Sequence, residues 1–469
     1  MENKKFNLAQ EIELVKEDCL RPTRKWGRST QIWLGILCCV AAWGLFAFIH
    51  QLRHGLGVTA MRNYVSWGLY ISTFVFFIGI SHSGTLVSAI LRITKQEWRR
   101  PITRSAELLT FVSLLFGGIM PIIDLGRPDR VLNLVIFGRV QSPLLWDVIS
   151  IMTYFTGSTV FLYLPMIPDM ALCRDRLIVT KTRFDKFRKR LYTFMAIGWT
   201  GTKTQWHKLE TVMTIMTIVI IPVAVSVHTV VSYIFAMTLR PGWDSTVFGP
   251  YFVAGALYSG SAGVILGMAV FRHLYKLEKY ITPRHFDLMG RIVLALTLIY
   301  AYLNLNEYWI PAYKMATHEG FLLRDLFFGS YSGVFWTLQF GTVLLPIIIM
   351  SIPKGRQILP LSITCVIIVI GAWIKRYIIV VPTLLHPYMP IQEVPADWSS
   401  YFPNWVEWSV TMGCLSGIFI VITLFSKFFP MMAVWEVEEG LEIEHDRQVA
   451  LEMKKKREME KMSQEVTVN

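Results

Sequence analysis

Two carboxylates mark the stretch IMPIIDLGRPDRVLNLVIFGRVQSPLLWD, which joins two apolar segments of the chain. Asp124 closes the first segment and Asp147 opens the second. Each segment is long enough to cross a lipid bilayer, so both carboxylates are expected just inside the same membrane face. Together with Arg127, Asp129 and Arg130, they indicate a polar site whose carboxylates accept protons. The alternative is that these charges only end two helices in interfacial water.

A buried arginine points to the same membrane face. Arg376 lies in GAWIKRYIIVVPTL, a few residues below the outer end of an apolar segment. An arginine inside a membrane needs a partner. Asp124, Asp147 and Asp244 are expected at its level, so the sequence favours a pocket in which acid and base converge. The alternative is that Arg376 extends its side chain to the interface.

Two histidines, His82 and His228, lie well inside apolar segments. At about 1.5 Å per residue, His82 is expected roughly 27 Å below the outer end of its segment, and His228 roughly 15 Å below the outer end of its own. Two histidines that bind one haem b must lie at one depth, so these positions argue against haem. Either histidine is otherwise a hydrogen-bonded residue of helix packing.

A proton path is the second chemistry that buried ionisable residues permit. Glu307, in LNLNEYW, is a further carboxylate inside an apolar segment. His82 is expected near the cytoplasmic third of the membrane, far from the outer pocket, with hydroxyl groups on Ser81, Ser83 and Thr85 beside it. These groups predict a relay through hydroxyls or water. The alternative is that both residues only make hydrogen bonds within the bundle.

The composition indicates which elements hold these residues. The chain has 469 residues, of which 53% are hydrophobic and 17% are charged, against about 25% charged in soluble domains. Repeated apolar segments separated by short basic loops predict an all-α, polytopic membrane protein. Gly126 and Pro128 end the third segment, and Pro143 begins the fourth. The ten expected spans are about 31–50, 64–92, 106–124, 144–167, 209–237, 249–271, 289–311, 330–352, 358–382 and 406–429.

The basic residues predict the orientation of these spans. Of the 46 Lys and Arg residues, 36 fall on the side that carries the N-terminus and 8 on the other side. This bias places residues 1–30 and the tail 430–469 in the cytoplasm, on either side of a membrane domain at 31–429. The carboxylates then lie at the periplasmic face. Topology and anionic lipid explain the net charge of +13, so nucleic acid is not an expected partner.

The motifs of several enzyme classes are missing from the sequence. The six cysteines form no CxxC or CxxCH, which argues against an iron–sulfur cluster, structural zinc or c-type haem. No Walker, HExxH or GxSxG motif supports phosphoryl transfer or hydrolysis. A membrane pocket with carboxylates, an arginine and aromatic residues suits a quinol, whose hydroxyls need proton acceptors and whose tail needs access to lipid.

Several segments resemble a known family in sequence and in order, from about residue 79 to 384. The chain resembles the NrfD/PsrC-type integral membrane subunits of respiratory molybdopterin-family complexes, and within them the quinol-binding membrane protein (ActC) of bacterial alternative complex III. The matching segments are GISHSGTLVSAILRI, EWRRPITRSAELLT, IIDLGRPDR, QSPLLWDV, IPDMALCRDR, GWTGTKTQWHKLE, SVHTVVSYIFA, PGWDSTVFGPYFVAGA and KRYIIVVPTL.

The resemblance implies a fold and a working complex. It implies ten helices, eight of them in two four-helix bundles, in the bacterial inner membrane. It implies a site for quinol, expected to be menaquinol, near the periplasmic face, and no haem, iron–sulfur cluster or metal in this chain. Electrons would pass to a periplasmic iron–sulfur subunit, beside a second NrfD-like membrane subunit and multihaem cytochrome c subunits, and protons would be translocated.

Individual positions match this family unevenly. Asp147 and Arg376 match the resemblance, and His228 lies in a matching segment. Asp124 and Asp244 stand where the family often has histidine, and Ile234 where it often has an acidic residue. The direction of electron flow therefore stays open.

Two other functions fit part of the sequence. A secondary transporter also has about ten helices and buried charges, but no inverted repeat or pair of broken helices is evident. A haem b membrane anchor would need the two buried histidines as ligands. Solute flux into vesicles would favour the first, and a Soret band from the purified chain the second.

Overall fold

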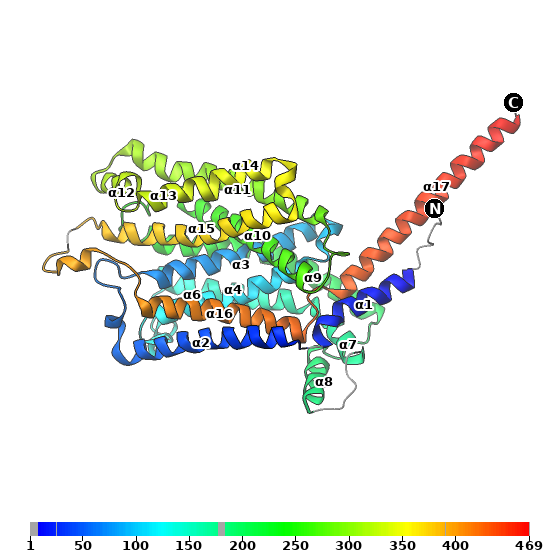
Figure 1. Cartoon of the computed structure of the whole chain (residues 1–469), viewed down its shortest axis with the longest axis horizontal. Helices are drawn as coiled ribbons and strands as arrows, with labels where there is room; N and C mark the ends of the chain where they lie inside the picture. The colour runs from blue at the N-terminus through cyan, green and yellow to red at the C-terminus, as the bar shows by residue number, and fades with distance from the viewer. Residues whose placement is uncertain (1–7, 25, 177–182, 390, 469) are drawn as a thin grey trace.

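The computed structural model describes residues 8–24, 26–176, 183–389 and 391–468. These residues are mostly helical and contain no strand, and ten helices among them are long and apolar enough to cross a membrane (Figure 1). The predicted all-α class and the ten predicted spans are confirmed. The spans are α2 (Arg28–His54), α3 (Leu69–Ile93), α4 (Thr103–Asp124), α6 (Pro143–Tyr163), α9 (Lys203–Ala236), α10 (Phe248–Leu274), α11 (Pro283–Lys314), α13 to α14 (Ser332–Ser351), α15 (Ile358–Leu385) and α16 (Trp405–Phe428).

Shorter helices connect or extend the spans. A π-helical turn, η4 (Gln339–Leu344), joins α13 (Ser332–Leu338) to α14 (Leu345–Ser351). The other α-helices are α1 (Leu8–Arg24), α5 (Asn133–Ile136), α7 (Met166–Arg176), α8 (Arg183–Met195), α12 (Thr317–Phe328) and α17 (Val434–Val468). The 3₁₀ turns are η1 (Leu56–Val58), η2 (Glu97–Arg99), η3 (Pro128–Arg130), η5 (Pro353–Arg356) and η6 (Ala396–Ser399).

Local sequence explains where several spans begin. Thr202 caps α9 through the backbone N–H of Gln205, and Asn404 caps α16 in the same manner through Glu407. Such caps satisfy backbone donors that the first turn of a helix leaves without partners. Pro143 occupies the first turn of α6, where its missing N–H costs nothing.

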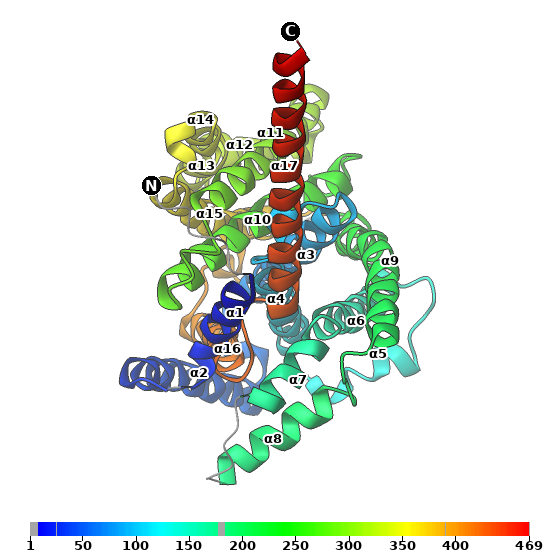
Figure 2. The same ribbon diagram turned by 90° about the vertical axis from the view of Figure 1, so that its right-hand side faces the viewer.

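The spans pack around α3, which is buried along most of its length. The helices α3, α4, α6 and α9 contact one another in a closed ring, and so do α10, α11, α14 and α15 (Figure 2). These rings meet where α3 packs against α10 and α15. The expected arrangement in two four-helix bundles would require such contacts, and it stays a prediction.

The remaining two spans, α2 and α16, form a close pair beside α4. A Cβ added at Gly44 would lie 2.7 Å from the Cα of Gly413, so these two backbones touch. Only glycine permits this approach, which is a common way for helices to associate in a membrane.

Both described ends of the chain lie at one end of the helix array, together with α1, α7, α8 and α17 (Figure 1). We call this end the basic end, and the other, which carries α12 and the loop before α16, the opposite end. The helix α8 lies across the basic end, whereas α17 projects away from it. The shared position of the two ends agrees with an even number of spans. That the basic end faces the cytoplasm stays a prediction.

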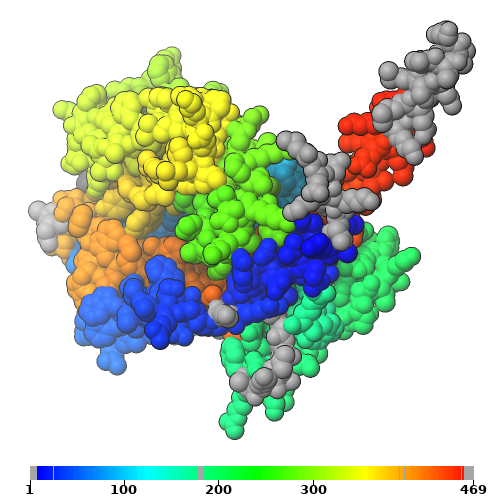
Figure 3. Space-filling view, turned by 45° about the vertical axis from the view of Figure 1, so that its right-hand side comes forward, coloured from blue at the N-terminus to red at the C-terminus, as the bar shows by residue number. Residues whose placement is uncertain are grey.

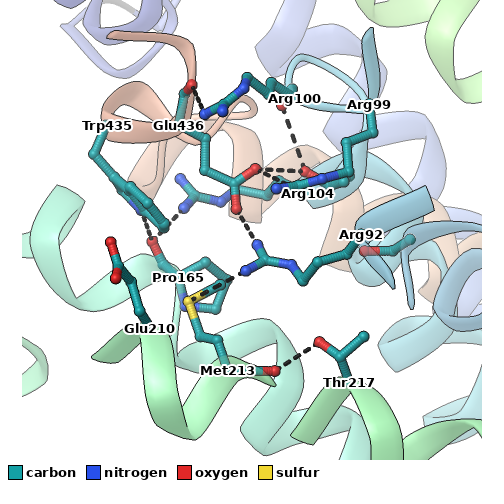
Figure 4. A network of polar contacts seen from close by, with 12 residues as sticks. Arg92, Arg99, Arg100, Arg104, Pro165, Glu210, Met213, Thr217, Trp435 and Glu436 are labelled. Atoms are coloured by element: carbon teal, nitrogen blue, oxygen red, sulfur yellow. Dashed lines mark hydrogen bonds and ion pairs between the residues drawn. The ribbon is translucent and has the colours of Figure 1, made fainter. Parts of the chain in front are cut away.

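A group of arginines holds the start of α17 against the membrane helices (Figure 4). Arg99 pairs with the Glu436 carboxylate at 2.8 Å, Arg92 pairs with its other oxygen, and Arg100 donates to the Glu436 backbone carbonyl at 2.7 Å. Arg104 pairs with Asp169 on α7, and both are almost fully buried. We call these residues the arginine clasp. Through the pair of Arg104 with Asp169, the clasp joins the segment EWRRPITRS to the segment IPDM.

The clasp makes the carboxylate of Glu436 a determinant of stability. Burial alone would raise the pKa of Glu436, but Arg99, Arg92 and Arg100 together hold it below its usual value. Because the folded-state pKa of Glu436 is lowered, the ionised carboxylate makes its full contribution to the free energy of unfolding above about pH 4.5. This contribution is lost as the pH falls through the lowered pKa.

Glu436→Gln is therefore expected to release α17 at neutral pH. Breaking one side of a buried ion pair costs about 3–5 kcal/mol. Trypsin should cleave at Arg447 several-fold faster in this variant, and thermal unfolding should begin at a lower temperature. Glu442→Gln, at an exposed position of the same helix, is the control. Equal cleavage rates in the two variants would show that the clasp does not hold α17.

Candidate functional site

Arg376 lies deep among the spans and not at the interface. It is 5% exposed on α15, and its Nη2 atom is 2.9 Å from the position of a Cβ added at Gly255 on α10. A Cβ added at Gly79 on α3 would lie 4.0 Å from the same atom. Two glycines on facing helices thus make room for the guanidinium. Its Cζ atom stands 4.7 Å from the ring centroid of Phe252, a cation–π contact.

No carboxylate neutralises this arginine within the described part of the chain. The ion pairs there include none between Arg376 and Asp124, Asp147 or Asp244. Its electrostatic neighbours are instead the hydroxyls of Tyr251 and Tyr300. The expectation that three aspartates converge on Arg376 is not what the packing produces, because each aspartate sits near a helix end while Arg376 is nine residues inside α15.

A pair of histidines lies beside this arginine. The ring centroids of His82 and His228 are 4.6 Å apart, and His228 lies 5.9 Å from Phe252, the ring below Arg376. His228 is 0% exposed, and neither ring nitrogen has a hydrogen-bond partner of good geometry among the described residues, although the backbone of Phe252 is close. A buried imidazole with no partner is rare and indicates a site for a polar ligand.

The expected distance between the two histidines was wrong. Helix α3 begins at Leu69, so His82 is about 20 Å below its end and not roughly 27 Å. His228 lies about 12 Å below the end of α9 at Ala236, and the contact between the rings requires the two helices to be offset or tilted enough to remove the remaining difference. His82 is therefore part of the same polar cluster as Arg376, and not far from it as expected.

The contact also bears on the haem alternative. A haem bound by both histidines would have to lie between their rings. The rings touch edge to face at an interplanar angle of 62°, and the Nε2 atom of His82 is 2.7 Å from the carbonyl of Ala224. This pair therefore leaves no space for a macrocycle.

His82 has an unusual set of partners. Its Nδ1 atom lies 2.6 Å from the carbonyl of Ile78 and its Nε2 atom 2.7 Å from that of Ala224. A neutral imidazole has one N–H and can donate to only one of these carbonyls, whereas an imidazolium can donate to both. The site therefore holds acceptors for a second proton.

Asp147 belongs to a polar line on α6 that leads toward the histidines. It is 7% exposed, and its Oδ1 atom has no hydrogen-bond partner in the described ranges. Two turns further along the same face, Tyr154 donates to the carbonyl of Ser81 at 3.1 Å, and its ring lies 5.0 Å from that of His82. The buried hydroxyls of Ser83, Thr85 and Ser158 have no hydrogen-bond partner of good geometry among the described residues, although those of Thr85 and Ser158 lie close to Tyr154.

Asp124 lies in a different neighbourhood, near α2 and α16. Gln51 donates to the carbonyl of Ile123 at 3.0 Å and accepts from Tyr70 at 2.7 Å. The Oδ1 atom of Asp124 is buried without a partner in the part of the chain described, and the nearby charge is that of Glu407. Arg127 and Asp129, expected at the same polar site, are exposed and pair with each other at 3.0 Å.

Glu407 was not among the residues selected from the sequence. It is 0% exposed and accepts a hydrogen bond from Tyr401 at 2.5 Å and one from the backbone N–H of Ala60 at 3.0 Å. Burial and the adjacent carboxylate raise the pKa of Tyr401, so its hydroxyl stays protonated and donates. This carboxylate ties the loop before α16 to the loop after α2.

Glu307 forms a second cluster toward the opposite end. Its Oε2 atom accepts from Ser245 at 2.6 Å, and the exposed Asp244 is its neighbour in that loop. Lys375 donates to Tyr308 at 2.6 Å and is an electrostatic neighbour of Glu307. A cavity of about 40 Å³ beside Glu307 and Tyr308 is large enough for a few water molecules.

A hydrogen-bonded group of side chains begins at the two tyrosines beside Arg376 and extends along α11. Tyr251 contacts the hydroxyl of Tyr300 at 3.3 Å and donates to Asn304 at 3.1 Å, and Asn304 donates to Gln339 of η4 at 2.6 Å. The spacing of Tyr300, Asn304 and Glu307 places them on one helical face. This spacing, and the adjacency of Lys375 to Arg376, were the signals in the sequence that could have revealed this group.

The site contains no metal-binding arrangement in the described ranges. No group of three or more His, Cys, Asp or Glu side chains there could hold an ion. The prediction that the chain carries no metal, haem or cluster stays a prediction.

Comparison with known proteins places these residues in a family. A family profile described as polysulphide reductase, NrfD, matches residues 57–387. The C subunit of the selenate reductase of Mesobacillus selenatarsenatis is 25% identical over 425 residues, which cover 89% of this chain and 97% of that protein. The menaquinone reductase integral membrane subunit of Nitratidesulfovibrio vulgaris is 24% identical over 440 residues, 92% and 97% of the two chains.

A shorter match has higher identity. A putative membrane subunit of the dimethyl sulfoxide reductase of Halobacterium salinarum is 32% identical over 239 residues, about half of each chain. The matched profile covers most of the membrane-spanning part, including α3 with His82, α9 with His228 and α15 with Arg376. The chain is a multi-pass integral membrane protein that belongs to the polysulphide reductase NrfD family.

Proposed function

We propose that this chain is the quinol-reactive membrane subunit of a multi-subunit oxidoreductase, and that its substrate is menaquinol or menaquinone. One observation carries the proposal: Arg376 is buried without a carboxylate partner beside His228, and neither ring nitrogen of His228 has a hydrogen-bond partner of good geometry in the described chain. A quinone ring offers two oxygens that these groups can bind. The menaquinone reductase subunit among its relatives supports this substrate class.

The chemistry of each residue follows from its position. Oxidation of a quinol releases two electrons and two protons. Arg376 donates hydrogen bonds to a ring oxygen and favours negative charge on it. His228 accepts a hydroxyl proton, and Asp147 receives protons from the α6 side. Asp244, exposed in the loop before α10, contacts quinol where it enters from the opposite end, and Asp124, in its separate position near α2 and α16, is a second proton acceptor and quinol-binding residue at that end.

Entry of the ring requires movement of aromatic side chains. The cavity beside Glu307 is too small for a quinone, and Phe252 covers the guanidinium. Phe252 lies 4.4 Å from Phe248 and 5.9 Å from Phe235, so these rings form the wall between cavity and arginine. Rotation of this wall joins the two spaces.

The electrons need a partner protein, since the family resemblance implies no redox centre in this chain. We place an iron–sulfur subunit at the opposite end, in an assembly with a second NrfD-like membrane subunit and multihaem cytochrome c subunits. Large apolar side chains crowd that end with little cover, as expected for a surface that a protein partner buries. Those more than three-quarters exposed are Phe137, Leu239, Tyr313, Phe328, Met389 and Phe402.

The function is tested on the intact complex. The chain is isolated with its copurifying subunits from a bacterial inner membrane, and oxidation of a menaquinol analogue is followed with an added electron acceptor. Turnover that depends on this chain supports the proposal. Solute uptake by vesicles that hold the chain alone, without quinol turnover by the complex, would favour a transporter and contradict it.

Proton translocation is the finer part of the proposal. His82 with the hydroxyls near it serves the basic-end side, and Glu307 with Lys375 and Ser245 serves the side of Asp244. No hydrogen-bonded chain joins His82 to Glu307 among the described residues, so water or the bound quinol must connect them.

His82→Leu is expected to lower the number of protons moved per electron. The leucine keeps the volume of the side chain but cannot carry a proton, so quinol turnover should continue at a reduced rate. The ratio is measured in sealed vesicles with a pH-sensitive dye, and Ser226→Ala, at an exposed position of α9, is the control. Unchanged coupling in His82→Leu would make this histidine a packing residue.

A further inference from the structure

A basic cavity lies at the basic end, far from the proposed quinol site. Its volume is about 560 Å³, and residues of α1, α2, α16 and the turn after α10 line it. Figure 3 shows the dark-blue N-terminal helices lying against the green part of the chain at this end. Nothing in the proposed electron or proton chemistry uses these residues.

Three cations meet in this cavity. Lys427, near the end of α16, is 8% exposed, donates to the carbonyl of Pro22 at 3.4 Å and stands 5.9 Å from the ring centroid of Tyr275. Arg21 donates to the carbonyl of Tyr275 at 2.8 Å and also lies 3.5 Å from Asp18. Lys276 is exposed, with a positive φ of 54°, in the turn that follows α10. The cavity therefore carries an excess of positive charge.

The start of α2 adds hydrogen-bond donors to these cations. Ser29 and Thr30 line the cavity in the first turn of α2, and the cap residue Gly27 has no side chain to bind their backbone N–H groups. Uncapped N–H groups and the positive end of the helix dipole together favour an anion.

The side of the cavity that faces the membrane-spanning part of α2 is apolar. Trp33 and Leu274 line it and are 46% and 64% exposed, and Ile36 continues the exposed face one turn deeper on α2. Trp33 is fixed by a hydrogen bond to Thr423 at 3.3 Å and by edge contact with Phe419. The cavity therefore combines cationic side chains with the exposed apolar face of α2 beside them. This combination suits a ligand that has an anionic head and an apolar tail.

We propose that this cavity binds the phosphate headgroup of an anionic phospholipid, whose acyl chains lie along the exposed face of α2. Lys276, Lys427 and the first turn of α2 hold the phosphate, and Trp33 contacts the start of the chains. Basic pockets between spanning helices are typical sites for anionic lipid. The ligand would hold α1, α2, α10 and α16 together at one membrane surface.

The test uses the full chain with its copurifying subunits in a neutral detergent after removal of lipid. Native mass spectrometry during titration with dioleoyl phosphatidylglycerol is expected to show one tightly bound molecule. Phosphatidylcholine should bind at least tenfold more weakly, because its headgroup has no net charge. Inorganic phosphate should not displace the lipid, because it lacks acyl chains; displacement at equal concentration would identify a simple anion site and overturn the proposal.

Two variants test the residues. Lys276→Gln combined with Lys427→Gln should weaken phosphatidylglycerol binding about tenfold or more. Ser29→Glu should do the same while keeping the fold, because a carboxylate in the first turn suits the helix dipole but repels phosphate. The control is Lys203→Gln with Lys208→Gln, two exposed basic positions at the same end. Wild-type lipid affinity in Ser29→Glu would contradict the site, whatever the folding of the double variant.

Discussion

Arg376→Leu is expected to abolish quinol-dependent electron transfer while the complex still assembles. The leucine fills most of the space between Gly79 and Gly255 but removes every donor to the quinone oxygen. Loss of one positioned donor lowers turnover by about 10²- to 10³-fold, and the guanidinium supplies several. Assembly should survive because no described carboxylate depends on this arginine for a salt bridge.

The measurement is menaquinol oxidation by the purified complex, with its protein composition determined on the same sample. Arg376→Lys keeps the charge but not the planar fork, so it should recover only part of the activity. Arg130→Leu, at an exposed position of η3, is the matched control and should behave like the wild type. Normal turnover in an assembled Arg376→Leu complex would remove this residue from the site.

Asp147→Asn should lower quinol turnover by roughly 100-fold, the usual scale for a lost general base. The amide keeps the shape of the side chain but cannot accept a proton. Its Oδ1 atom has no hydrogen-bond partner in the described structure, so the substitution breaks no bond to that atom that holds the fold.

Substitutions of two other aspartates show whether the effect is specific to Asp147. Asp124→Asn tests the second buried carboxylate, whose electrostatic neighbour is Glu407. Asp129→Asn removes an exposed partner of Arg127 and should leave turnover unchanged. If Asp147→Asn impairs only assembly, with normal activity in the fraction that assembles, the carboxylate is structural.

The membrane architecture followed from the sequence because its causes are local. A bilayer demands about 20 apolar residues in each span and satisfies the backbone within each helix, so hydropathy alone located all ten spans. Pro143 and Asn404 set helix starts within one residue of the expected positions, whereas the cap at Thr202 begins α9 six residues before its expected start. The order of motifs also indicated the family that the profile match shows.

Which residues lie together in the site depends on contacts between helices, and no local sequence pattern encodes these contacts. Counting residues from the edge of an apolar segment put His82 and His228 at different depths, yet their rings touch. The same counting grouped Asp124, Asp147 and Asp244 with Arg376, which instead meets Phe252 and two tyrosines. A count along one helix cannot include its tilt or the height of its neighbour's end.

The chain by itself determined which residues are buried in the membrane and which could carry protons. Only the tertiary structure decided their partners: Gly79 and Gly255 for Arg376, Ser245 for Glu307, and the ring of His228 for His82. Burial of a polar residue is a property of its own segment, because water is absent along the whole span. The hydrogen-bond partner of that residue, in contrast, comes from a neighbouring helix. How the helices pack depends on the shapes of side chains across the entire bundle.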